Sequence, residues 1–127
     1  MQEQSQPRVL VVDNDEHASA LIQNLLGHAG FNVTSTTECA TAMILLQSSD
    51  FASVFVDEAL VGQLWPSILG CRKATGKPFV IVLQSGIPNP RGTTSYNSFP
   101  ADGFVNKRRA CDILDAAGEA VSAAVAR

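Results

Sequence analysis

Short apolar runs alternate with longer amphipathic segments along almost the whole chain. Five runs, rich in β-branched residues and mostly ending at polar or turn residues, have the features of buried parallel strands. They cover residues 8–12, 31–34, 53–56, 79–83 and 103–105. Two of these runs are followed at once by an acid, Asp13 after the first and Asp57 after the third.

The segments between the strands show helical spacing of apolar residues. Asp15 is a plausible N-cap of the first helix, and Gly30 stands where a helix commonly ends. A second helix is expected over residues 38–47, a third opening at Trp65 and Pro66, and a last one over residues 109–126. The inward positions are predicted to be Ala18, Leu21, Ile22, Leu25, Leu26, Ala42, Leu45, Leu46, Ile113, Leu114, Ala117 and Val121.

One segment breaks the alternation. Residues 85–101 are rich in Gly, Pro, Ser, Thr and Asn, and Pro88 and Pro90 forbid a regular helix across the first half. We expect a loop with at most a short helical turn at residues 94–98. The helix that would normally connect the fourth and fifth strands is therefore predicted to be short or absent.

Strand–helix alternation predicts a doubly wound α/β fold with a five-stranded parallel sheet in the order 2-1-3-4-5. Residues 8–127 form one domain in this interpretation, and residues 1–7 form a flexible tail. In such a sheet the functional crevice lies at the carboxyl ends of the strands, where the winding reverses. Asp13 and Asp57 fall at that position, so the topology predicts that they share a site.

Composition narrows the function classes. The 127 residues are 46% hydrophobic and 17% charged, with a net charge of -3, which is typical of a globular protein and not of a nucleic-acid binder. The one basic cluster, residues 107–109, is interpreted as local structure. Cys39, Cys71 and Cys111 form no CxxC pair, so they are expected to be reduced packing residues. We expect a cytoplasmic protein that binds neither nucleic acid nor a membrane.

The segments RVLVVDND, SVFVD and ADGFVNK resemble the first, third and fifth strands of response-regulator receiver domains, which have a flavodoxin-like fold. The resemblance covers nearly the whole chain from Arg8 onward. It implies that Asp57 is the phosphoacceptor and that Lys107 contacts the phosphoryl oxygens. It also implies a Mg²⁺ site formed by Asp13, Asp57 and the backbone carbonyl of Ala59. Phosphoryl transfer to a carboxylate brings anions together, so a hard cation and an ammonium must neutralise the charge.

Several positions depart from the family pattern. Asn14 stands where the family has a second acid, which weakens the expected Mg²⁺ site without removing it. Asp15 could compensate, although its interpretation as a helix cap is preferred. The family's hydroxyl switch residue falls on Ser85 in preference to Leu83, and the aromatic switch position falls on Phe104. Arg108 follows the lysine, where the family commonly has proline.

Three functions remain open. The first is a receiver-type module in phosphorelay signalling, with impaired or atypical Mg²⁺-dependent phosphorylation and no enzymatic activity of its own. Its partners would be a histidine kinase or phosphotransfer protein and a downstream effector protein. The second is a pseudo-receiver that acts only by binding other proteins. The third, a small enzyme or flavin binder, is disfavoured because no Gly-rich phosphate loop follows the first strand.

A few other residues invite a functional interpretation. His17 and His28 are expected to be exposed helix residues with no role. Trp65 is either a packing residue at a helix start or an exposed anchor for a partner, and packing is preferred.

Overall fold

A computed structural model describes residues 6–75, 79–84, 101–106 and 109–126. Within these ranges, strands and helices alternate up to β4. The elements are β1 (Arg8–Val12), α1 (Glu16–His28), β2 (Asn32–Thr36), α2 (Cys39–Ser48), β3 (Ser53–Asp57), α3 (Val61–Thr75), β4 (Phe79–Gln84), β5 (Gly103–Asn106) and α5 (Ala110–Ala126). The expected short or missing helix in residues 85–101 lies, except for Ala101, outside the described residues.

The sheet has the order β2-β1-β3-β4-β5, and every described pairing is parallel, which confirms the predicted topology. β1 lies between β2 and β3, and its last residue, Val12, pairs with Thr36 on one side and Val56 on the other. On the far side of β3, Asp57 pairs with Leu83 of β4. The carboxyl ends of these four strands therefore meet at one edge of the sheet.

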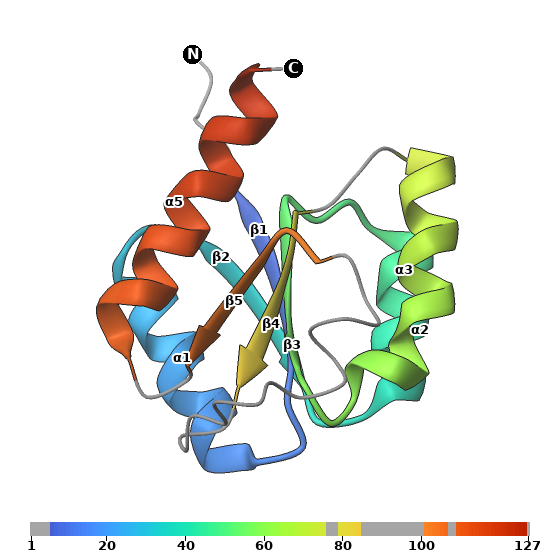
Figure 1. The fold of residues 1–127 in the computed structure, drawn as a ribbon, viewed down its shortest axis with the longest axis horizontal. Helices are drawn as coiled ribbons and strands as arrows, with labels where there is room; N and C mark the ends of the chain where they lie inside the picture. The colour runs from blue at the N-terminus through green and yellow to red at the C-terminus, as the bar shows by residue number, and fades with distance from the viewer. Residues whose placement is uncertain (1–5, 76–78, 85–100, 107–108, 127) are drawn as a thin grey trace.

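Helices cover both faces of the sheet, with α1 and α5 on one side and α2 and α3 on the other (Figure 1). Side chains of β1 alternate between these layers because successive residues of a strand point to opposite faces. Leu10 and Val12 belong to the core cluster with α2 and α3, whereas Val9 and Val11 belong to the cluster with α1 and α5. All five residues of β3 are buried, so the acid that ends it is held in the interior of the domain.

Two details of the predicted helices were wrong. Leu21 is 69% exposed, because the buried stripe of α1 runs through Ser19, Ile22 and Leu26 and places Leu21 outside it. The third helix begins at Val61, one turn before the predicted start, and the Leu64 N–H donates to the Leu60 carbonyl. Pro66 therefore lies inside α3, beyond the first four residues, and its missing N–H removes one hydrogen bond of the helix.

The predicted ends of α1 are confirmed. The Asp15 side chain accepts hydrogen bonds from the backbone N–H groups of His17 at 3.0 Å and Ala18 at 3.4 Å. At the other end Gly30 has a φ of 99°, a conformation that glycine adopts without strain. The Gly30 N–H donates to Gly27 and the Phe31 N–H to Leu26, which is the Schellman pattern of helix termination.

Replacing the cap residue is expected to lower stability. Asp15→Ala leaves the first N–H groups of α1 without their side-chain acceptor, and we expect a loss of about 1 kcal/mol in the free energy of unfolding. Asp15→Asn keeps an acceptor oxygen and should lose much less. Urea unfolding followed by circular dichroism measures both variants. Equal losses in the two would show that the charge of Asp15, and not its cap hydrogen bonds, stabilises the helix.

Candidate functional site

The two acids that follow strands in the sequence lie side by side in the fold. Asp13 comes directly after Val12 of β1, and Asp57 ends β3 directly after Val56, the partner of Val12. Neighbouring strands are about 4.8 Å apart, so the backbones of the two acids are adjacent. Both are buried, with Asp13 0% and Asp57 5% exposed. The predicted proximity of the two acids is confirmed, whereas their role as a functional site stays a prediction.

Each carboxylate is oriented by the turn that follows it. The Asp13 Oδ1 atom accepts the N–H of Asp15 at 2.9 Å, and the Asp57 Oδ2 atom accepts the N–H of Ala59 at 2.9 Å. In both cases an aspartate binds the backbone two residues further on, the geometry of an Asx turn. The backbone donors were not identified from the sequence, although an aspartate at the end of a strand is the available signal for such a turn.

Neighbouring strands fix the backbone of the site as well. The Asp13 N–H donates to the Thr36 carbonyl at 3.2 Å, which extends the pairing of β1 with β2 by one residue. The Glu58 N–H donates to the Leu83 carbonyl at 2.9 Å, which holds the turn after β3 against β4. The two carboxylates therefore sit on a rigid edge built from four strands, as a binding or catalytic constellation requires.

The donor atoms fit a hard divalent cation. Two buried carboxylates at neighbouring strand ends supply negatively charged oxygen atoms, the ligands that a hard cation prefers. Mg²⁺ is commonly held by one or two carboxylates, with water and other oxygens completing its octahedron. Within the described ranges, no cluster of three or more His, Cys, Asp or Glu side chains is placed to bind a metal.

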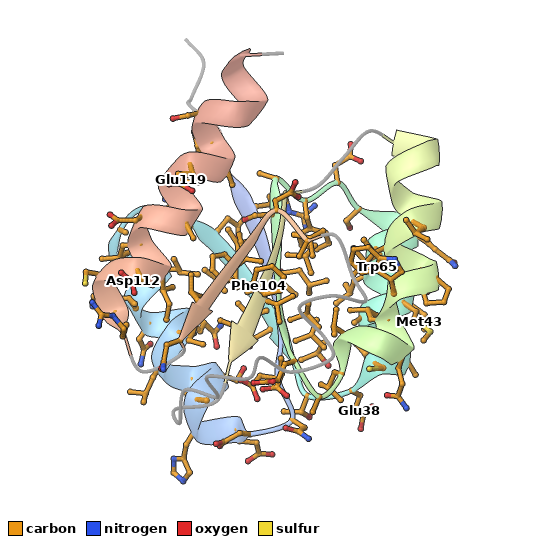
Figure 2. The ribbon with its side chains drawn as sticks, in the orientation of Figure 1. Glu38, Met43, Trp65, Phe104, Asp112 and Glu119 are labelled. Carbon is orange, nitrogen blue, oxygen red and sulfur yellow. The ribbon has the colours of Figure 1, made fainter. Side chains whose placement is uncertain are left out.

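The other predicted site residues are placed as follows. Asn14 and Ala59 are exposed and adjoin the two buried acids in sequence, and no contact tests their role toward a metal. Phe104 of β5 pairs with Val82 and packs, half-buried, against the core cluster that includes Trp65 (Figure 2). Lys107, together with Ser85 and Arg108, lies outside the described residues, so its predicted approach to Asp57 stays a prediction.

Residues predicted to have structural roles mostly keep them. Trp65 is buried in the cluster between the sheet and α2 and α3, which confirms packing over an exposed anchor. His17 and His28 are exposed, as expected. The prediction for the cysteines was wrong at Cys111, which is exposed because it lies in the first turn of α5 on the solvent side. Cys39 is partly buried, and this burial raises the pKa of its thiol.

In the part of the chain that the structure describes, no helix is both long enough and apolar enough to cross a bilayer.

Comparisons with known proteins identify the fold. No protein-family model matches the sequence. A search of curated proteins gives no match either. Solved structures do match: a response regulator from Thermotoga maritima has a TM-score of 0.75 and 23% identity, over 93% of this chain and 99% of the other. The chemotaxis response regulator CheY4 of Vibrio cholerae has a TM-score of 0.68 and 16% identity, over 91% and 99% of the two chains.

A third structure is the signal receiver domain of an HD domain-containing protein from Pseudomonas fluorescens Pf-5. Its TM-score is 0.73 at 17% identity, over 96% of this chain and 91% of the other. Sequence identities this low establish a common fold and do not establish a common activity. The chain therefore has the fold of response-regulator receiver domains, as the three sequence segments predicted.

Proposed function

We propose that this chain is a receiver-type module of phosphorelay signal transduction, with Asp57 as the phosphoacceptor. The observation that carries the proposal is the pair of buried carboxylates, Asp13 and Asp57, at the paired carboxyl ends of β1 and β3. This edge of the sheet is also where doubly wound folds place their ligands, which supports the proposal.

The proposed reaction is a phosphoryl transfer to a carboxylate. An oxygen of Asp57 attacks the phosphorus of the donor, a new oxygen–phosphorus bond forms, and the bond from phosphorus to the leaving group breaks. Asp13, Asp57, the Ala59 carbonyl and, more weakly, Asn14 would hold Mg²⁺, which supplies charge neutralisation at the phosphoryl oxygens when bound. Lys107 is proposed to contact the same oxygens.

Partners follow from that reaction. A histidine kinase or a phosphotransfer protein would donate the phosphoryl group, and a downstream effector protein would read the modified state. Ser85 and Phe104 are the proposed switch residues. Phe104 pairs with Val82 and packs against the cluster under α2 and α3, and this packing supports its place in the switch.

Incubation with Mg²⁺ and acetyl phosphate, followed by intact-mass measurement, tests the proposal. We expect a mass increase equal to one phosphoryl group. The increase should not appear when EDTA is present, and hydroxylamine should remove it by cleaving the acyl phosphate. A chain that stays unmodified while folded would support the alternative, a pseudo-receiver that acts only through protein contacts. The amide of Asn14 in place of an acid supports that alternative, since it leaves the site with one less negative charge.

Restoring the missing acid is expected to tighten metal binding. Asn14→Asp adds a negative charge next to the buried carboxylates, so we expect the Mg²⁺ affinity to rise. The rise should be limited to about three- to tenfold, because position 14 is exposed and water screens its charge. Fluorescence of Trp65, a core residue of α3 shortly after the Asp57 turn, reports the titration. Asn24→Asp adds the same charge at an exposed position further along α1 and should leave the affinity unchanged. Equal gains in the two variants would trace the effect to net charge.

A further inference from the structure

A polar pocket outside the proposed phosphoacceptor site opens between α1 and the end of β2. Its volume is about 340 Å³, within the range of small-molecule sites. One wall is a stripe of α1, formed by Glu16, Ser19 and Gln23, whose spacing puts them on one face of the helix. The opposite wall is the segment that ends β2, formed by Ser35, Thr36 and Thr37.

Ser19 is the unusual member of this lining. Only 4% of its surface is exposed, yet it contributes to the pocket wall. Among the described residues, the Ser19 hydroxyl has no hydrogen-bond partner, although its backbone N–H donates normally to the Asp15 carbonyl. A buried hydroxyl without a partner destabilises a protein. A ligand in the pocket that supplies a hydrogen bond would remove that cost.

Other polar groups in the pocket are already held in place. The Ser35 hydroxyl donates to the Gln23 Oε1 atom at 3.1 Å, which ties the two walls together. The Thr36 hydroxyl accepts the backbone N–H of Glu38 at 3.1 Å. These contacts preorganise the walls, so a ligand would meet a formed surface and would not have to order it.

Charge determines which ligand suits this lining. Glu16 is the one charged residue among the described residues that line the pocket, and none of them is Lys or Arg. Glu38, Asp13 and Asp15 are close along the chain to the two walls, so an anion would be repelled. A cation with N–H donors would pair with the Glu16 carboxylate and donate to the Ser19 oxygen.

From this arrangement we propose that the α1–β2 pocket binds a small organic cation with an ammonium or guanidinium group. The pocket is separate from the carboxylate pair, but the Thr36 carbonyl in its wall accepts the N–H of Asp13. Binding does not require that Asp57 is phosphorylated, so the proposal stands independently of the proposed function.

Agmatine, which carries both a guanidinium and an ammonium group, is a suitable probe of the intact chain. Titration at millimolar concentration, followed by two-dimensional amide NMR, should shift the signals of the α1 and β2 residues that line the pocket. A neutral molecule of similar length, 1,4-butanediol, should leave them in place. Absence of saturable shifts with agmatine, or equal shifts with the diol, would overturn the proposal.

Variants separate binding from folding. Ser19→Ala removes the buried hydroxyl, so it should weaken agmatine binding about three- to tenfold while leaving the free protein as stable or more stable. Glu16→Gln should weaken binding about two- to fivefold, because Glu16 is exposed and its ion pair is screened. Glu119→Gln removes the same charge from an exposed position on α5 and should bind as the parent does. Unchanged affinity in both Ser19→Ala and Glu16→Gln would exclude this pocket as the binding site.

Discussion

Replacing Asp57 by asparagine is expected to abolish phosphoryl incorporation from acetyl phosphate completely. The substitution keeps the shape of the side chain, and its amide oxygen can still accept the N–H of Ala59. An amide is a poor nucleophile toward phosphorus, however, so the transfer step has no acceptor. Intact-mass measurement with Mg²⁺ present gives the result directly, and circular dichroism confirms that the fold is retained.

The neighbouring acid is the matched control for this experiment. Glu58→Gln removes one negative charge from the adjacent, half-buried position and should still incorporate a phosphoryl group. Persistent incorporation in Asp57→Asn would place the acceptor elsewhere, with Asp13 as the nearest buried carboxylate. Peptide mapping of the modified chain would then identify it.

Phe55→Ala is expected to have the largest effect on stability. Phe55 is a large side chain with 0% exposure, on the strand between β1 and β4, and it packs in the cluster with α1 and α5. Its truncation leaves a cavity that the surrounding strands cannot fill, at a cost of about 3–5 kcal/mol. A domain of this size has about 5–15 kcal/mol in total, so the variant should lose much of its stability. Urea unfolding measures the change.

An exposed apolar residue provides the comparison. Ile44 on α2 is 65% exposed, and Ile44→Ala should change the free energy of unfolding by less than about 0.5 kcal/mol. A loss in Ile44→Ala that approaches the loss in Phe55→Ala would mean that a second surface covers α2 in solution. Sedimentation would then show whether that surface belongs to another copy of the chain.

Most of the fold could be predicted because the central strands β1, β3 and β4 are apolar runs with polar ends. Buried parallel strands need residues such as Val and Ile at consecutive positions, and such runs can be recognised in the sequence. Helix boundaries were less certain. The start of α3 was placed at Trp65 because proline favours a first turn, whereas the chain begins the helix at Val61 and accepts Pro66 inside it. Leu21 shows that an apolar residue need not face the core.

The site could be predicted only in part. An acid directly after a buried strand is visible in the sequence. The parallel pairing of β1 with β3 brings two such acids, Asp13 and Asp57, close together, so their proximity could be predicted. The orphan hydroxyl of Ser19 has no such signal, because a serine within a helix is ordinary in sequence and its burial depends on where β2 ends. The two Asx turns that hold the carboxylates were also missed, although an aspartate at the end of a strand is a signal for such a turn.

The order of the strands has a further consequence for solution behaviour. β2 forms one border of the sheet, and its sequence, Asn-Val-Thr-Ser-Thr, has one apolar residue among polar ones. Border strands of parallel sheets can recruit strands from other molecules and initiate fibrils, most readily when they are long and apolar. This strand is five residues long, and hydroxyl side chains occupy three of its positions. The most apolar strands, β1, β3 and β4, have neighbours on both sides. This arrangement protects the folded protein from edge-to-edge aggregation.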